Sequence, residues 1–181
     1  HIGSLLSDRN PEVLWQVLSD LITENSDFAK AFQLKLAGTI SEDILANLKT
    51  YNLESYVDSL GYLSHQKAFS AMQSAQVLAL IEIDSYNTKG IIPGKLFEYL
   101  LAERPIIAIG PEDWDVEKIL NDTNSGIAYN YSEAEAIKKQ ILSYFKLFQQ
   151  EKLLINSKNT EKYSRKHLTQ QLSEVIKNSI N

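Results

Sequence analysis

The sequence predicts an α/β fold, namely a Rossmann-like parallel sheet of about six strands with helices on both faces. Two observations lead to this prediction. Short apolar runs typical of buried strands recur along the chain, and segments with apolar residues at helical spacing lie between them. Parallel strands need crossover connections, and the favoured crossover is a right-handed helix. The strands are expected at Ile2–Leu6, Gln33–Ala37, Val57–Leu60, Val77–Ile81, Pro105–Ile109 and Gly126–Tyr129.

Helix-start signals follow several of these strands. Asn10 as N-cap with Pro11 at the first helical position predicts the first helix, in which apolar residues from Val13 to Ile22 share one face. Ser41 and Ser64 are the expected N-caps of the next two helices.

Two further helices are expected towards the end of the chain. Ser132 and Glu135 form an S-x-x-E capping box before a run with helical spacing. The stretch Glu161–Ile180 reads as an appended C-terminal helix, roughly residues 160–181, that packs against something other than the sheet.

Composition limits the function classes. The 181 residues, 44% of them hydrophobic, are predicted to form one domain over residues 1–181. The formal net charge of −5 disfavours a nucleic-acid surface. The longest apolar runs, such as VLALI at 77–81, are much shorter than the roughly 18 residues needed to cross a bilayer, so no transmembrane segment is expected. The chain has no cysteine, hence no disulfide or thiolate metal site. With no recognisable signal peptide we expect a cytoplasmic location, and the inner face of the membrane is the alternative for the full-length protein.

The candidate site lies in the loops after the strands, because ligands of open α/β sheets bind beyond the carboxyl ends of the strands. The first such loop, from Gly3 to Arg9, lacks the G-x-G-x-x-G pattern, which disfavours a dinucleotide-dependent dehydrogenase. It offers Gly3 and Ser4 for a tight turn, a guanidinium at Arg9 and a following helix start. This combination is suited to binding an anion.

The loop after the fourth strand is longer and leads into a helix beginning near Lys95. Pro93 and Gly94 precede the helix, so N–H groups from Gly94 to Leu96 and the Lys95 ammonium group are expected to favour a diphosphate. Glu98 lies one turn further, where a carboxylate can accept hydrogen bonds from a ribose diol. The alternative is that Arg9, Lys95 and Glu98 are ordinary solvated surface residues. The expected buried face of this helix comprises Leu96, Phe97, Leu100 and Leu101.

Three segments resemble a known family: GSLLSDRNPEVLWQVL, GYLSHQKAFSAMQSAQVLALI and IPGKLFEYLLAERPIIAIG. Together they resemble the C-terminal half of GT-B-fold glycosyltransferases of the retaining group 1 class, in the bacterial surface-polysaccharide branch. The resemblance implies that this chain binds a nucleotide-diphosphate sugar. It also implies an N-terminal domain, absent from these 181 residues, that binds a glycan or lipid-linked acceptor and receives the last helix. The isolated chain is then expected to be inactive.

The carry-over of the family's motifs is partial. Arg9 stands at the position of the family's diphosphate-binding lysine, whereas Ser4 replaces its arginine. Glu98 ends the family's E-x7-E motif, but the first glutamate of that motif falls on Gly90. Lys95 is additional to the pattern and is expected to supply phosphate-binding charge.

The turn at Gly61, Tyr62 and Leu63 matches the family's base-binding turn and leaves UDP and GDP both open. Arg9, Lys95 and Glu98 are the predicted catalytic residues. The predicted donor-binding residues are Gly3, Ser4, Arg9, Gly61, Tyr62, Leu63, Pro93, Gly94, Lys95, Leu96 and Glu98.

Other functions remain as alternatives at this stage. No cofactor and no metal are expected, although Asp113, Trp114 and Asp115 form a D-x-D sequence of the kind that binds metal in other glycosyltransferases. The histidines show no zinc-ligand spacing. A non-catalytic Rossmann-like binding or scaffolding domain, or a sugar-nucleotide epimerase of related fold, would share the same fold features.

Overall fold

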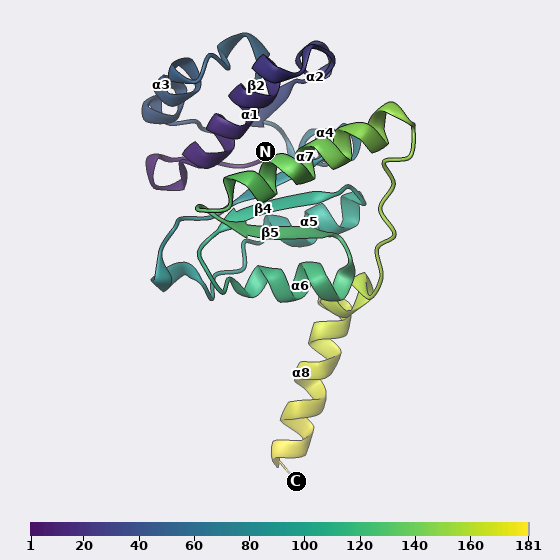
Figure 1. The fold of residues 1–181 in the computed structure, drawn as a ribbon. Coiled ribbons are helices and arrows are strands. Elements are labelled where there is room, and N and C mark those ends of the chain that lie inside the picture. The colour runs from purple at the N-terminus through teal and green to yellow at the C-terminus, as the bar shows by residue number, and fades with distance from the viewer. Residues whose placement is uncertain (181) are drawn as a thin grey trace.

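The structure, a computed structural model, describes residues 1–180, with the side chain of residue 180 left out, and it has the predicted α/β architecture (Figure 1). The strands are β1 Leu34–Ala37, β2 Val57–Gly61, β3 Leu78–Ile81, β4 Ile106–Gly110 and β5 Gly126–Asn130. The α-helices are α1 Glu12–Glu24, α2 Ser26–Ala31, α3 Glu42–Thr50, α4 His65–Ser74, α5 Lys95–Ala102, α6 Asp115–Thr123, α7 Ala134–Gln149 and α8 Arg165–Ile180. Short 3-10 turns lie at Ser7–Arg9, Glu54–Tyr56, Tyr86–Thr88 and Thr160–Tyr163.

All strand pairs within the described residues are parallel. β1 pairs with β2, and β3, β4 and β5 pair in that order. Ile106 of β4 pairs with Leu78 of β3 and with Gly126 of β5, so the three strands start at the same level. The carboxyl ends of the strands therefore meet along one edge, as the sequence predicted.

The described residues form five strands rather than the expected six, in two sheets, β1–β2 and β3–β4–β5, because Ile2–Leu6 forms no regular strand. This segment makes two isolated parallel bridges to the β1 side, Ile2 with Ala37 and Leu5 with Ile40. Gly3 has a φ of 102°, which breaks the extended backbone. Towards β3, the N–H of Ile2 donates to the hydroxyl of Tyr99, and this hydroxyl donates to the Ala79 carbonyl. A side chain thus occupies the place of a strand-to-strand hydrogen bond.

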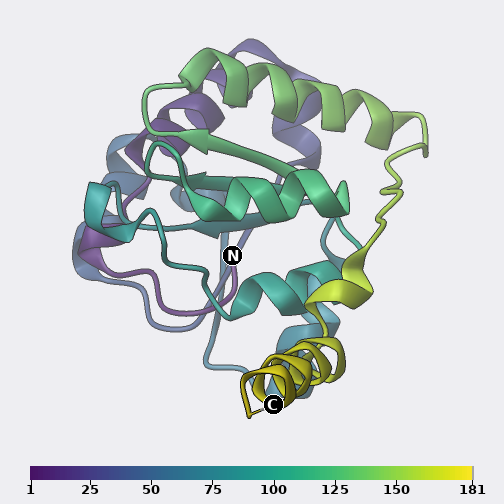
Figure 2. The ribbon, with the colours of Figure 1, turned by 90° about the horizontal axis from the view of Figure 1, so that it is seen from below.

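Helices cover both faces of the sheet and enclose two apolar cores (Figures 1 and 2). Alternate residues of β4 point to opposite cores: Ile107 and Ile109 pack with α1, α2, α3 and α7, whereas Ile106 and Ala108 pack with α4, α5 and α6. This alternation explains why the whole of β4 is buried and reads as a continuous apolar run.

Of the four predicted N-caps, Ser64 is confirmed with its capping hydrogen bond, Ser41 is confirmed in position only, and Asn10 and Ser132 are wrong. The Ser64 side chain accepts a hydrogen bond from the Lys67 N–H, as an N-cap does. Asn10 is not a cap, because its side chain accepts from the Trp15 indole and α1 starts at Glu12. Ser132 also fails, since its hydroxyl donates to the Asn130 side chain and α7 starts two residues later.

Ser41 stands at the N-cap position of α3, as predicted, but its side chain makes no capping hydrogen bond. Its buried hydroxyl has no hydrogen-bond partner within residues 1–180.

The C-terminal helix α8 extends away from the body of the molecule (Figure 1). The segment before it is attached to α6, where the Asp122 carboxylate accepts hydrogen bonds from Asn159, Lys162 and Tyr163. The exposed apolar residues of α8 are Leu168, Leu172, Val175 and Ile176. No helix within residues 1–180 is both long enough and apolar enough to cross a membrane.

Candidate functional site

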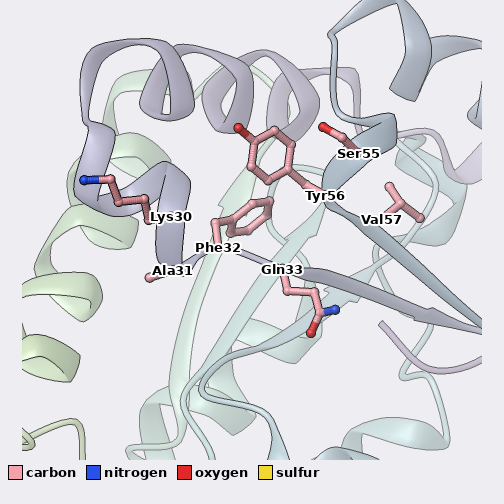
Figure 3. Close-up of a pocket in the computed structure, with 7 residues that line it drawn as sticks. All are labelled: Lys30, Ala31, Phe32, Gln33, Ser55, Tyr56 and Val57. Carbon is pink, nitrogen blue, oxygen red and sulfur yellow. The ribbon is translucent and has the colours of Figure 1, made fainter.

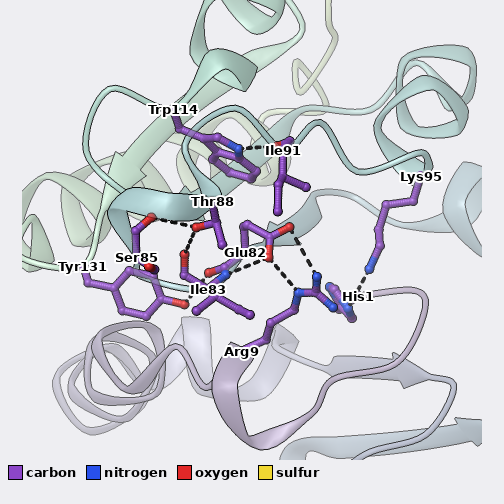
Figure 4. Close-up of polar contacts among 10 residues, drawn as sticks. All are labelled: His1, Arg9, Glu82, Ile83, Ser85, Thr88, Ile91, Lys95, Trp114 and Tyr131. Atoms are coloured by element: carbon purple, nitrogen blue, oxygen red, sulfur yellow. Dashed lines mark hydrogen bonds and ion pairs between the residues drawn. The ribbon is translucent and has the colours of Figure 1, made fainter.

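The predicted site residues lie on the segments that leave the carboxyl ends of the strands. Arg9 follows the Ile2–Leu6 segment, the Gly61 turn ends β2, and Lys95 begins the helix that follows the long loop after β3. Figure 4 shows the side chains of Arg9 and Lys95 pointing towards each other near His1, with Glu82 bound to Arg9. Sequence reasoning had not identified Glu82.

Glu82 directly follows β3 and is 1% exposed. Its Oε1 accepts hydrogen bonds from Arg9 Nε at 3.0 Å and from the Ile83 N–H at 2.9 Å, and Arg9 Nη2 lies 3.4 Å from Oε2. A buried carboxylate requires such partners, because the loss of hydration otherwise makes its charge very unfavourable. The signal that sequence reasoning passed over was an acidic residue at the end of the apolar run VLALI.

Lys95 is the first residue of α5, and its side chain extends over Gly3. A Cβ atom at Gly3 would lie 2.9 Å from Lys95 Nζ, so this approach requires glycine. Nζ is 3.2 Å from His1 Nε2, and within residues 1–180 no carboxylate forms an ion pair with it. Burial, followed by the nearby Arg9 guanidinium, lowers the pKa of Lys95 to about 8, whereas Glu82 acts in the opposite direction.

The long loop between β3 and α5 is held in place by buried polar contacts (Figure 4). The Thr88 hydroxyl donates to the Ile83 carbonyl at 2.8 Å, and the Trp114 indole donates to the Ile91 carbonyl at 2.7 Å. Tyr131 donates its hydroxyl to the Glu82 carbonyl at 2.8 Å, and burial raises the pKa of this phenol well above its usual range. The start of α5, and with it Lys95, is therefore attached to a fixed loop.

The start of α5 presents fewer N–H groups than the sequence suggested. The Leu96 N–H donates to the Pro93 carbonyl at 2.9 Å, and the Leu96 side chain is fully buried in the core. The N–H groups of Gly94 and Lys95 have no acceptor within residues 1–180 and remain available to an anion. The expected buried face of α5 also needs correction, because Leu101 is 68% exposed and Tyr99 is buried instead. Tyr99 is three positions after Leu96, so both side chains lie on the same face of α5 and pack in the same core.

Glu98 contacts a residue that sequence reasoning treated as ordinary helix surface. Its Oε1 lies 3.1 Å from Nε2 of His65, the first residue of α4. The contact brings Glu98 close to the Gly61 turn, which precedes α4. In that turn Gly61 has a φ of 61° and its carbonyl accepts from the Gly38 N–H, while the Tyr62 side chain is 95% exposed.

The structure therefore gathers the predicted residues into two groups. Arg9 and Lys95 form a cationic group near Glu82, with Gly3 beside the Lys95 ammonium group. Glu98 contacts His65, which follows the Gly61 turn. Ser4 is exposed and makes no side-chain hydrogen bond within residues 1–180.

A glycine that sequence reasoning missed, Gly38, has a φ of 111° and packs on Gly3: a Cβ there would meet the Gly3 backbone at 2.7 Å. The signal for Gly38 was a glycine directly after the apolar run of β1.

The D-x-D sequence is used structurally. Trp114 is buried, and Asp115 Oδ1 accepts from Lys118 Nζ at 2.8 Å. Within residues 1–180, no group of three or more His, Asp or Glu side chains is placed to hold a metal ion.

One open cavity lies far from these residues, at the amino ends of β1 and β2 (Figure 3). It measures about 340 Å³, and its lining includes Phe32, Gln33, Tyr56 and Val57. Because Leu34 pairs with Val57 at the first position of the ladder, this cavity is at the opposite edge of the sheet. None of the predicted site residues lines it.

No protein-family model and no curated protein matches this chain. Solved structures do match. HepE of Anabaena in complex with UDP aligns with a TM-score of 0.63 at 15% identity over 98% of this chain and 48% of its own. WaaG, a glycosyltransferase involved in lipopolysaccharide biosynthesis, aligns with a TM-score of 0.59 at 14% identity; the alignment covers 80% of this chain and 37% of WaaG. Sucrose-phosphate synthase of Thermosynechococcus elongatus aligns with a TM-score of 0.56 at 18% identity; the alignment covers 80% of this chain and 36% of the synthase.

These alignments establish the fold: the chain has the architecture of one Rossmann-like half of a GT-B glycosyltransferase. The chain spans less than half the length of each of these proteins.

Proposed function

We propose that this chain is the donor-binding half of a glycosyltransferase that uses a nucleotide-diphosphate sugar. One observation carries the proposal: Lys95 is a largely buried cation beside Arg9, at the carboxyl ends of the strands, and within residues 1–180 no carboxylate forms an ion pair with it. Arg9 and Lys95 carry two positive charges and Glu82 one negative, so the group has an unbalanced positive charge. A diphosphate bound there would supply the missing negative charge. The fold it shares with HepE, which was solved with UDP, supports this choice of anion.

Arg9 and Lys95 have separate roles in this proposal. Lys95 contacts the diphosphate directly, together with the N–H groups of Gly94 and Lys95 at the helix start. Arg9 has five N–H donors, of which Glu82 accepts two, so the remaining donors reach the diphosphate while the ion pair fixes the guanidinium. These charges stabilise the leaving diphosphate as the bond between sugar and phosphate breaks.

Glu98 and the Gly61 turn bind the nucleoside part of the donor in this arrangement. The Glu98 carboxylate accepts hydrogen bonds from the ribose hydroxyls, and the backbone of Gly61, Tyr62 and Leu63 meets the edge of the base. A backbone edge suits uracil and guanine alike, so both UDP and GDP donors fit the proposal. No metal takes part in the proposed binding mode, since cationic side chains and N–H groups provide the positive charge.

The acceptor is proposed to be a glycan or lipid-linked sugar bound by a second, N-terminal domain, in a cytoplasmic enzyme of bacterial surface-polysaccharide synthesis. The exposed apolar residues of α8 support an additional domain, because a helix with an unpaired apolar stripe gains stability when that stripe is covered. A transfer site between two domains needs both, so this chain alone is expected to bind donor nucleotide without transferring sugar.

A nucleotide panel in a thermal-shift assay tests the proposal. We expect UDP or GDP to raise the melting temperature selectively, with ADP as the comparison. If no nucleoside diphosphate changes the melting temperature or gives calorimetric heat at millimolar concentration, the chain is a non-catalytic domain and the proposal is wrong. Donor hydrolysis by the isolated chain well above a buffer control would contradict the part that requires a second domain.

A further inference from the structure

The contact between His65 and Glu98 joins two elements of the proposed donor site. His65 begins α4 directly after the turn proposed to meet the base, and Glu98 lies on α5 and is proposed to bind the ribose. The two side chains meet at 3.1 Å although the His65 side chain is 82% exposed and has solvent available. The geometry thus places an imidazole N–H donor on one oxygen of the carboxylate.

This contact leaves the carboxylate able to bind a diol. A carboxylate oxygen has two lone pairs, so Oε1 can accept from His65 and from one ribose hydroxyl together. Oε2 has no partner within residues 1–180 and is available to the second hydroxyl. Without His65, the Glu98 side chain, which is 39% exposed, would be able to rotate among solvent-facing rotamers.

The position of His65 is itself fixed by its surroundings. The preceding Ser64 caps α4 through the Lys67 N–H, and the Gly61 carbonyl accepts from the Gly38 N–H at 2.8 Å. The turn and the first residue of α4 are therefore anchored to β1. The contact with His65 therefore connects the Glu98 carboxylate to this fixed turn.

We propose that His65 is a positioning residue that holds the Glu98 carboxylate in the orientation that binds the ribose diol. This inference rests on the proposed donor-binding function. His65 has no contact with the nucleotide in this arrangement. Its contribution therefore depends on both Glu98 and the ribose hydroxyls.

Calorimetric titration with UDP and GDP, and with their dideoxy analogues that lack both ribose hydroxyls, tests the inference. His65→Ala should weaken binding of the ribonucleotide about three- to tenfold, the effect of losing one hydrogen bond. His65→Gln, which keeps an N–H donor at a similar reach, should recover most of this loss. Gln66→Ala, a substitution at the next position of α4, which is also exposed, is the matched control and should bind like the wild type.

Two further comparisons separate positioning from a general effect on α4. In a Glu98→Ala background, His65→Ala should cause no additional loss. For the dideoxy nucleotides, His65→Ala and wild type should differ less than about twofold. An equal loss for ribo- and dideoxynucleotides would overturn the inference in favour of a purely structural role.

The inference and the proposed function fail in different ways. If Glu98→Ala weakens ribonucleotide binding and His65→Ala does not, His65 has no positioning role while the donor site stands. If Glu98→Ala has no effect, the ribose assignment and the role of His65 both fall. If the wild type binds neither UDP nor GDP, the proposed function itself is wrong.

Discussion

The Nζ atom of Lys95 lies so close over Gly3 that a Cβ atom at position 3 would be 2.9 Å from it. These two residues are 92 positions apart in sequence, and the backbone at Gly3 leaves space for the ammonium group of the first residue of α5. The φ of 102° at Gly3 adds a second requirement for glycine.

Gly3→Ala should therefore weaken nucleoside diphosphate binding by displacing the ammonium group from its position. The positive φ should also cost about 1–3 kcal/mol of unfolding free energy. Denaturant unfolding and calorimetric titration with UDP and GDP measure the two effects. Unchanged diphosphate affinity in a folded Gly3→Ala protein would show that the position of Lys95 does not matter for binding.

Diphosphate affinity should fall as the pH rises above about 8. In the unliganded protein the pKa of Lys95 is lowered to about 8, and a bound diphosphate should raise it. Near about pH 7 the lysine is mostly charged in both states, so affinity changes little with pH. Above about pH 8, binding must take up a proton, so affinity should decline by up to about tenfold per pH unit. Nucleoside diphosphates are already fully ionised there, since their terminal phosphate titrates near about pH 6.

Calorimetry in buffers of different ionisation enthalpy measures this proton uptake directly. Lys95→Arg provides the control, because an arginine stays protonated and should remove the decline. The same decline in Lys95→Arg would assign the titration to another group.

The ion pair between Arg9 and Glu82 should respond asymmetrically to substitution. Arg9→Ala leaves the buried Glu82 carboxylate without its cation, whereas Glu82→Gln leaves an arginine whose side chain is 33% exposed and reaches water. We expect Glu82→Gln to cost about 1–3 kcal/mol and Arg9→Ala to cost more. The double variant should be more stable than Arg9→Ala alone. Urea unfolding of the three variants tests this order, and equal losses for both single variants would contradict the account of Glu82.

Nucleotide binding should not depend on divalent metal. The positive charge comes from side chains and N–H groups, and Asp115 of the D-x-D sequence already accepts from Lys118. Titrations in EDTA and in magnesium should give the same affinity within about twofold. A large loss in EDTA that is reproduced by Asp113→Ala would make these acids metal ligands instead.

The general fold was predictable because strands that are covered on both faces consist of continuous apolar runs in the sequence. β4 illustrates this, with every residue from Ile106 to Gly110 buried. The first strand was predicted wrongly because the same kind of apolar run contains Gly3, whose left-handed backbone interrupts it. Periodicity alone does not report a φ angle.

The parts of the site that depend on long-range contacts were less predictable. Glu82 and His65 act through partners 73 and 33 positions away in sequence. Such pairings follow from how the strands and helices are arranged, and a linear pattern of residue types contains no information about them.

In the proposed binding mode, the ammonium group of Lys95 binds the diphosphate of a donor nucleotide. Titrating wild type, Lys95→Ala and Lys118→Ala with UDP, uridine, GDP and guanosine tests it most directly, because Lys118→Ala removes an equal charge from the exposed surface of α6. Lys95→Ala should weaken binding of the diphosphate that the wild type prefers by about tenfold or more, and should change binding of the matching nucleoside by less than about twofold. High salt should reduce the loss only in part, because Lys95 is largely buried. Lys118→Ala should change neither affinity. Equal diphosphate affinities in Lys95→Ala and wild type would contradict the claim.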